Sequence, residues 1–474
     1  MSYQATIGLE THVQLNTRTK IWCGCPVDPE AAPNTNICPV CLGYPGALPV
    51  LNREAIRKTV QAGLLLGCTI AERSKHDRKS YFYPDMPKNY QITQYDQPLC
   101  LGGGVEIELE GKKRFIRINR IHLEEDVGKS THLPSASGID YNRAGTPLME
   151  IVTEPDLHSE DEALAYLTAL KQILQYGGVS DCNLEQGNIR CDVNVSVAEA
   201  DSDTLGVKAE IKNMNTFRGV HRALAYEIRR QSRAKENGEP LRQETRRWDD
   251  DQGVTQGMRS KEDAHDYRYF PDPDLAAIVL ADTEVETWRA DLPELPQARK
   301  ARFTDDLGLP DYDAGVLVAD REVADYFEEV VSAAEDNAKA ASNWVMTEVM
   351  RVLSETGGRP ADLKVSPAAL GKLILLVESK VLNNNKAKDV FAILVESGGD
   401  PEQVVKDKGW AQVSDTSAIE GYVRAAIDEN PSVVADYRGG KEAALQFLMG
   451  QVMKQSRGKA NPRMVLELLK EMLA

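Results

Sequence analysis

The stretch Arg190-Cys-Asp-Val-Asn-Val-Ser-Val197 alternates polar and apolar side chains at every position. Successive side chains of a β-strand point to opposite faces, so this pattern predicts a strand with one buried and one wetted face. Strands of that kind are typical of antiparallel sheets. The N-terminal half of the chain is therefore expected to contain an antiparallel sheet, with Asp192 on its polar face.

Four further segments share this period of two, and each places at least one carboxylate on its polar face. These segments are 6–15 with Glu10 and His12, 115–125 with Glu124, 148–154 with Glu150, and 207–212 with Glu210 between Lys208 and Lys212. The alternation turns Glu125 away from Glu124 unless the strand ends there. A sheet that joined these strands would bring several carboxylates together.

Carboxylates that meet at one place need cations, and Mg²⁺ suits this need because it prefers oxygen ligands and leaves positions open for substrate phosphates. The residues expected to form a magnesium-nucleotide site are Glu10, Glu124, Glu150, Asp192 and Glu210. Imidazole is a less usual magnesium ligand, so His12 would position a phosphate or bind a softer ion. A merely solvated face of an acidic protein would show the same alternation, and periodicity alone leaves both interpretations open.

Two close cysteine pairs, Cys23-Gly-Cys25 and Cys38-Pro-Val-Cys41, are separated by twelve residues. Two pairs on two turns can close a tetrahedron of thiolates, which predicts a zinc site. Four thiolates leave the ion no open position, so this zinc would be structural. The other four cysteines are expected to be buried packing residues: Cys68, Cys100, Cys182 and Cys191.

The segment from Arg78 to Gln91 interleaves basic and aromatic side chains. It could stack on a nucleotide base, or it could be a surface loop fixed by aromatic packing. Neither a P-loop nor a G-x-G-x-x-G motif is present, and Gly102-Gly-Gly104 is expected to form a hairpin turn. The residues expected to contact the nucleotide are Lys79, Tyr81, Lys88, Arg190 and Lys208.

The length of 474 residues predicts two to four domains. Apolar residues make up 42% and charged residues 27%, which is typical of folded globular protein. No apolar run approaches the ~20 residues of a membrane helix, and the N-terminus lacks the pattern of a secretory signal. We therefore expect a cytoplasmic protein without a membrane partner.

The net charge of −17 repels nucleic acid, so any RNA contact must use a local basic patch. Residues 206–247 carry eleven Lys or Arg against five Glu, although a solvated helix face is the simpler interpretation of that segment. Residues 434–474 carry seven basic against four acidic side chains. Both segments are candidates for an RNA contact.

The pattern of apolar residues changes near residue 290, from short alternating segments to helical spacing. The segment Asp291-Leu-Pro-Glu-Leu-Pro296 at this point is expected to be a linker. Beyond it, apolar residues recur every three or four positions, which predicts helices. The predicted helices cover 322–334, 338–355, 367–377 and 386–396, with a later group that begins near Asp400 and ends in a helix starting at Asn461-Pro462. We expect domains over 1–292, 293–405 and 406–474.

Several long motifs closely resemble the GatB family, whose members are one component of the aspartyl/glutamyl-tRNA amidotransferase. They are Gly8-Leu-Glu-Thr-His-Val-Gln14, Cys38-Pro-Val-Cys-Leu-Gly-Tyr-Pro-Gly46, Tyr81-Phe-Tyr-Pro-Asp-Met-Pro-Lys-Asn-Tyr-Gln91, His122-Leu-Glu-Glu-Asp126, Asn142-Arg-Ala-Gly-Thr-Pro147 and Lys212-Asn-Met-Asn215. The resemblance covers essentially the whole chain, and 383–474 resembles a C-terminal module shared with YqeY-like proteins. The related GatE proteins carry a large insertion for which this chain has no room.

The resemblance implies an α+β fold: a glutamine-synthetase-like, antiparallel catalytic cradle that carries the zinc knuckle, then an all-α helical domain and a YqeY-like tail that holds tRNA. It also implies the reaction. ATP activates the side-chain carboxylate of Glu-tRNA(Gln) or Asp-tRNA(Asn) as an acyl phosphate, and ammonia displaces the phosphate. A glutaminase partner, GatA, would supply the ammonia, and the small GatC protein would complete the heterotrimer GatCAB.

The resemblance also assigns expected roles to residues. Glu10, His12, Glu124 and Glu150 match the metal-centred active site of the family, with magnesium as the ion. The next candidates for handling metal, ammonia or phosphate are Glu125, Asp192 and Glu210. Contacts to the tRNA backbone are expected from Arg438, Lys441, Lys454, Arg457 and Lys459 in the tail.

Two other functions are compatible with the residues. One is a zinc-containing tRNA-binding or chaperone module without catalysis, in which the acidic strand faces are only solvated. The other is an ATP-dependent ligase acting on a small acid, which the full-length resemblance disfavours. ATP hydrolysis stimulated by mischarged tRNA would separate the catalytic from the non-catalytic interpretation.

Overall fold

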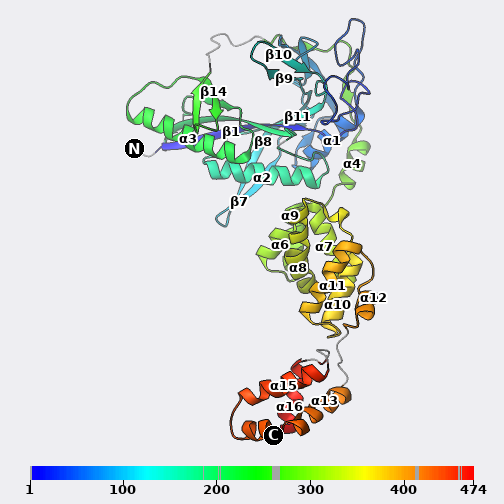
Figure 1. Ribbon diagram of the computed structural model, residues 1–474. Helices are drawn as coiled ribbons and strands as arrows, with labels where there is room; N and C mark the ends of the chain where they lie inside the picture. Colours follow the sequence, from blue (N-terminus) through cyan, green and yellow to red (C-terminus); the bar gives the residue numbers. More distant parts are fainter. Residues whose placement is uncertain are drawn as a thin grey trace. The chain divides into compact units, whose positions relative to one another are not determined.

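The structure is a computed structural model that describes residues 3–184, 186–200, 202, 204–258, 267–410, 416–456, 460 and 462–473 (Figure 1). The chain divides into two compact units, Met1–Leu295 and Pro296–Ala474. The first unit contains all the strands of the described chain, and the second is helical. The expected α+β fold, with a sheet followed by helices, is therefore confirmed.

Ten strands of the described first unit form one sheet, in the order β15-β14-β13-β12-β1-β11-β8-β6-β2, with β7 also paired to β8. Its central strands are the long ones predicted from alternation: β1 Tyr3–Gln14, β8 Lys112–Glu125, β11 Pro147–Thr153 and β12 Ile189–Glu199. The shorter strands are β2 Thr69–Ile70, β6 Cys100–Leu101, β7 Gly104–Leu109, β13 Ala209–Lys212, β14 Glu244–Asp249 and β15 Val254–Gly257.

The sheet is mixed rather than purely antiparallel. Among the described pairings in this sheet, β13 and β14 alone run parallel. A parallel pair requires a crossover connection, and helix α3 (Phe217–Glu236) provides it between these two strands. The basic segment 206–247 therefore consists largely of this crossover unit.

Helices cover one face of the sheet, and the other face is polar. Figure 1 shows α2 (Glu160–Tyr176) and α3 along the same side of the strands, and α1 (Arg53–Leu65) packs on β8. Val193, Val195 and Val197 point into this core and are no more than 1% exposed. Arg190, Asp192 and Asn194 lie on the opposite face, as the alternation of β12 predicts.

Smaller sheets flank the main one. Strands β4 (Asp77–Ser80), β5 (Tyr90–Thr93) and β16 (Phe270–Pro271) pair with each other, so the aromatic segment predicted from Arg78 to Gln91 is a hairpin. The remaining pairs are β3 Arg73–Ser74 with β17 Ile278–Val279, and β9 Lys129–His132 with β10 Ser137–Asp140. Helix α4 (Asp282–Ala290) precedes the end of the unit.

Gly102-Gly-Gly104 is not the predicted hairpin turn. Strands β6 and β7 both pair with β8, so these glycines connect two segments along the same edge. Gly103 has a φ of +81°, and a Cβ there would lie 2.4 Å from the carbonyl oxygen of Leu66. The hairpin turn lies instead at Glu110 and Gly111, between β7 and β8.

The second unit is built from the predicted amphipathic helices. Those before residue 411 are α5 Pro296–Asp305, α6 Asp311–Leu317, α7 Arg321–Ala333, α8 Ala338–Trp344, α9 Met350–Thr356, α10 Pro367–Glu378, α11 Asn384–Ser397 and α12 Pro401–Lys408. A π-helix, Val345–Val349, joins α8 to α9, and Pro360–Asp362 is a short 3₁₀ turn. Side chains of Asp320, Ser366 and Asn383 cap the helices that follow them.

A separate apolar cluster lies in the last helices, which are α13 Thr416–Glu429, α14 Pro431–Arg438, α15 Ala443–Gln455 and α16 Pro462–Leu473. Val423, Leu448 and Leu469 are fully buried within it. The earlier helices of this unit have their own cluster, which includes Val405 of α12. The expected domain boundary after residue 405 therefore falls inside α12.

No helix among the described residues is both long enough and apolar enough to cross a membrane.

Candidate functional site

A row of four polar side chains crosses the middle of the open sheet face. Register places Arg190 opposite His12, His12 opposite Glu150, and Glu150 opposite His122. Residues directly opposite each other on neighbouring strands share a face and contact one another. The row therefore joins β12, β1, β11 and β8, and residues far apart in the sequence meet there.

The two imidazoles of this row converge with two carboxylates, Glu150 of the row and Glu124 from the polar face of β8. The His12 Nε2 atom lies 3.4 Å from a Glu150 oxygen and 3.8 Å from a Glu124 oxygen. The His122 Nε2 atom lies 3.4 and 3.6 Å from oxygens of the same two carboxylates. These separations exceed the ~2.7–2.9 Å of a closed charge-assisted hydrogen bond. The side chains thus surround a common point without closing on each other.

The donor atoms of His12, Glu124 and Glu150 all lie within 4.8 Å of one another, close enough to hold one metal ion. Two carboxylates supply the hard oxygens that Mg²⁺ prefers, and one imidazole adds a less usual ligand. Nearby, the buried Nε atoms of Arg120 and Arg190 have no hydrogen-bond partner among the described residues. The site therefore combines cation ligands with unsatisfied donors that suit a phosphate.

The electrostatics of this group favour the charged forms of both histidines and of Glu150. Burial disfavours an imidazolium, but the close Glu124 and Glu150 carboxylates outweigh it and raise the pKa of His122 to about 9. Burial likewise opposes the charge on His12, yet the Glu150 and Glu124 carboxylates raise its pKa. Burial would raise the pKa of Glu150, but both imidazoles together lower it strongly.

A second group lies one register position further along the same face. Glu10 lies opposite Asp192, and its carboxylate accepts a hydrogen bond of 2.9 Å from the Asn194 amide. The Lys212 ammonium donates to Asp192 at 2.7 Å and lies 2.9 Å from Glu210. Glu10 therefore shares the face of His12 but is not part of the three-residue group within 4.8 Å.

Glu125 points away from Glu124, as the alternation of β8 predicts. Its carboxylate pairs with Lys88 and accepts a hydrogen bond of 2.8 Å from the backbone N–H of Ile92. The next residue, Asp126, is 3% exposed and accepts 2.9 Å and 2.8 Å hydrogen bonds from Arg190 and Gln14. These contacts fix the end of β8 beside the row.

The predicted nucleotide contacts do not all lie in one place. Arg190 is in the row, whereas Lys88 is paired with Glu125. The Lys79 ammonium lies 4.8 Å above the ring of Tyr267, and the Tyr81 ring stacks on Tyr83. Lys208 is exposed just before β13, where its charge acts on Glu210.

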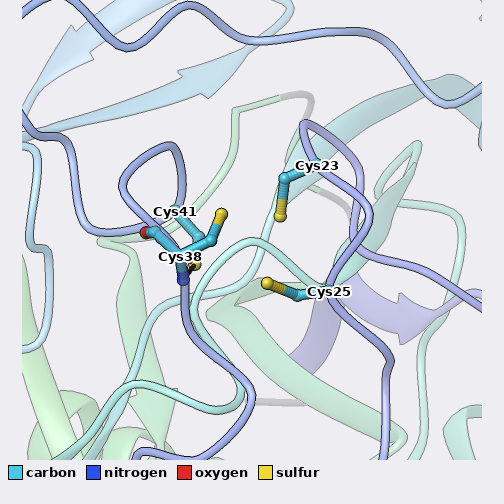
Figure 2. A group of neighbouring side chains, drawn as sticks. All are labelled: Cys23, Cys25, Cys38 and Cys41. Atoms are coloured by element: carbon cyan, nitrogen blue, oxygen red, sulfur yellow. Dashed lines mark hydrogen bonds between the residues drawn. The ribbon is translucent and has the colours of Figure 1, made fainter.

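The four predicted zinc ligands come together. The sulfur atoms of Cys23, Cys25, Cys38 and Cys41 all lie within 4.8 Å of one another, and Figure 2 shows the two pairs facing each other. A hydrogen bond from Cys23, the backbone of Cys38 and the charge of Lys20 outweigh burial and lower the pKa of the Cys41 thiol to about 4. The remaining cysteines are buried, as predicted.

Of the predicted tRNA contacts in the tail, Arg457 and Lys459 lie outside the described residues. Arg438 and Lys454 are exposed, and the Lys441 ammonium lies 2.9 Å from the Asp436 carboxylate. Arg438 also donates a 3.5 Å hydrogen bond to the carbonyl of Leu473.

Sequence reasoning missed several members of the site. Alternation places His122 on the same face of its strand as Glu124, but His122 was not named as a site residue. Asn194 and Lys212 likewise follow from the alternation of their strands, but their partners depend on register.

A largely antiparallel sheet that gathers carboxylates, imidazoles and cations on its open face, followed by a helical unit, defines an α+β protein with a candidate metal site. Comparison with known protein families identifies the family of this chain. Residues 5–286 match the GatB/GatE catalytic domain, and residues 325–473 match the GatB domain. The chain therefore belongs to the GatB family of amidotransferase subunits.

Curated relatives agree over the full length. The chain is 50% identical to the B subunit of the aspartyl/glutamyl-tRNA(Asn/Gln) amidotransferase of Caldicellulosiruptor bescii, covering 100% of this chain and 99% of the relative. Identity is also 50% to the protein of the same name from Thermoanaerobacter sp. strain X514, with complete coverage of both chains. The corresponding protein from Geobacter sp. strain M21 is 50% identical over 99% of each chain.

Proposed function

We propose that this chain uses ATP to activate the side-chain carboxylate of Glu-tRNA(Gln), Asp-tRNA(Asn) or both, so that ammonia can convert it to the amide. A carboxylate is a poor acyl donor because its leaving group would be oxide. Phosphorylation supplies a stable leaving group, and the protein then has to position the reactants and neutralise phosphate charge.

The observation that carries this proposal is the row Arg190–His12–Glu150–His122 in a member of the GatB family. A solvated face would leave its carboxylates exposed, whereas Glu124 is 4% exposed and the Glu150 side chain 14%. Burying carboxylates costs free energy unless cations compensate them. His12 and His122 provide this compensation in the described structure, and a metal ion held by Glu124 and Glu150 would take it over. The buried carboxylates therefore support a cation site rather than a wetted surface.

The donor set fits Mg²⁺, with His12, Glu124 and Glu150 as ligands and Glu10 close by on the same face. When bound there, Mg²⁺ would supply positive charge for the phosphates of ATP. Arg190 and Lys79 are the proposed phosphate contacts of the chain itself. Asp192 and Glu210, which lie on the open face, are the candidates that would accept a proton from ammonium or from the attacking amine, whereas Glu125 points away from this face and is paired with Lys88.

The four cysteines fit Zn²⁺, because four soft sulfur donors from two turns converge. In this proposal the zinc has no catalytic role and holds the loop between β1 and α1 in shape. That loop would face the acceptor end of tRNA. The basic residues of the tail, Arg438 and Lys454 among them, would contact the tRNA backbone.

The proposal is tested by Glu150→Gln and Glu10→Gln. Each variant should lose ATP-dependent phosphorylation stimulated by mischarged tRNA, because a carboxylate that serves the cation is removed. Binding of tRNA should remain, since the tail is unchanged. The measurements are phosphate release and filter binding of mischarged tRNA, with ammonium as the nitrogen donor.

Glu106→Gln is the matched control, because Glu106 is an exposed carboxylate that pairs with Lys113 on the hairpin of β7. An exposed ion pair contributes little, so this variant should match the wild type. If both Glu150→Gln and Glu10→Gln retain ATP-dependent phosphorylation, the proposed metal site is wrong.

A further inference from the structure

A row of aromatic rings borders the proposed active site. The rings of Tyr95 and Tyr269 stack with centroids 4.2 Å apart and an angle of 13° between their planes. The Tyr267 ring packs edge-on against Tyr269 at 6.2 Å, and the Lys79 ammonium lies 4.8 Å above Tyr267. We refer to the stacked pair of Tyr95 and Tyr269 as the tyrosine platform.

The platform lies beside the Glu124 and Glu150 carboxylates. Tyr95 follows Thr93 by two residues, and the Thr93 hydroxyl donates a 3.2 Å hydrogen bond to Glu124. The backbone N–H of Tyr95 is held by the Asp77 carboxylate at 3.1 Å. Burial and then the charges of Glu124, Tyr267 and Glu150 raise the pKa of Tyr269 to about 12, which agrees with this position.

One face of the platform is open. Tyr95 is 61% exposed, although Tyr269 covers one side of its ring. The exposed part of Tyr95 therefore lies away from Tyr269. An aromatic ring that is backed by a second ring on one face can stack a flat base on its other face.

We propose that the tyrosine platform stacks on an adenine base of a substrate at the proposed active site. This inference rests on the proposed function, which brings two adenines to the site: that of ATP and that of the 3′-terminal adenosine of the aminoacyl-tRNA. Lys79, next to the platform, offers a positive charge to the phosphate attached to the same nucleotide. The chemistry of the base is shared by both sources.

The test compares Tyr95→Ala with Tyr95→Phe in the amidotransferase assembled from the full-length chain and its partner proteins. Stacking is an interaction of the ring face, so Tyr95→Phe should keep wild-type kinetics. Tyr95→Ala should raise one KM roughly tenfold, within the range for loss of one base-stacking contact, and change kcat little. Tyr312→Ala is the control, because Tyr312 is 75% exposed on α6 of the second unit.

Two arms separate the sources of the adenine. A higher KM for ATP at saturating aminoacyl-tRNA assigns the platform to ATP. A higher KM for aminoacyl-tRNA at saturating ATP assigns it to the terminal adenosine, and a tRNA with an abasic 3′-terminal nucleotide should then bind wild type and Tyr95→Ala equally.

The proposal is overturned if neither KM rises in Tyr95→Ala, or if Tyr95→Phe is as impaired as Tyr95→Ala. Glu150→Gln in the same assay keeps this outcome separate from the proposed function. If the wild type is active, Glu150→Gln is inactive and Tyr95→Ala is unaffected, the proposed role of the tyrosine platform is wrong and the proposed function still stands.

Discussion

Single residues at the site depend on partners from other strands for their charge state. His122 is held charged by Glu124 and Glu150, and Lys212 by Asp192 and Glu210. Each group combines a cation with a carboxylate from a neighbouring strand. The open face therefore binds its own charges tightly in the absence of substrate, and a substrate must compete with these internal pairs.

His76, in contrast to these groups, is held in its neutral form. It is 2% exposed, its ring contacts Trp22 edge-on at 5.0 Å, and neither ring nitrogen has a hydrogen-bond partner among the described residues. Burial lowers its pKa from 6.5 to about 4, despite the nearby Asp272 and Asp77 carboxylates. The folded protein therefore holds His76 neutral at pH values where the unfolded chain protonates it.

This histidine should make stability depend on pH. The contribution of neutral His76 to the free energy of unfolding is complete above about pH 6.5. It is lost as the pH falls toward 4, because over this range only the unfolded chain takes up the proton. Between about pH 7 and pH 5 we expect a loss of about 2 kcal/mol in the free energy of unfolding. Urea unfolding followed by tryptophan fluorescence measures it.

His76→Phe removes the titrating group and keeps a ring against Trp22. Its stability should fall less than that of the wild type over this interval, and the difference between the two proteins isolates His76 from the carboxylates. Parallel pH profiles for the two proteins would contradict the prediction.

At the scale of elements, alternation predicted the central strands well. Segment 190–197 became β12 and 148–154 became β11, each with its polar residues on the open face. Periodicity within one strand does not encode which residue of the next strand lies opposite. The convergence of His12, Glu124 and Glu150 and the role of His122 therefore required the observed register.

The misassigned glycines have a similar explanation. Gly102-Gly-Gly104 has the composition of a turn, but the chain continues along the same edge of β8. A glycine is needed at 103 because the backbone at Leu66 approaches closely, and that contact comes from the end of α1. The π-helix Val345–Val349 was also not predicted, since its apolar residues fit the regular pattern of 338–355.

Gly103→Ala and Gly111→Ala form a matched pair at this scale. Both positions have positive φ, and an alanine is strained in this left-handed conformation. The free energy of unfolding of each variant should therefore fall by about 1–2 kcal/mol. A Cβ at 111 has no neighbour within 4 Å, whereas at 103 it meets backbone. Gly103→Ala should therefore lose about 2 kcal/mol more in urea unfolding. Equal losses would mean that the Leu66 backbone moves aside.

For the whole molecule, the tail can be tested separately from the cradle. The chain should be cut after residue 410 rather than 405, because Val405 and Trp410 belong to the apolar cluster of the preceding helices. Removal of the last helices should raise the KM for mischarged tRNA roughly tenfold, since phosphate contacts in the tail are lost. Ammonia-dependent kcat should change little.

Steady-state kinetics at two salt concentrations checks this prediction. The truncated chain should show a weaker dependence of KM on salt, as expected when cationic contacts to phosphate are removed. An unchanged KM and salt dependence would assign the tail a purely structural role.

The source of nitrogen is a second property of the whole chain. The sequence contains neither an amidase-like lysine with paired serines nor a convincing cysteine and histidine nucleophile pair. The isolated chain should therefore amidate mischarged tRNA with ammonium salts but not with glutamine. Addition of a glutaminase partner should restore glutamine-dependent turnover. Glutamine-dependent turnover by the pure chain alone would overturn this prediction.

The row across four strands has a consequence during synthesis. It joins His12, near the beginning of the chain, to Arg190, which leaves the ribosome far later. A nascent chain that has not yet exposed β12 lacks one end of the row, however well its first strands have formed. We expect ribosome-bound fragments that lack β12 to show no ATP hydrolysis stimulated by mischarged tRNA.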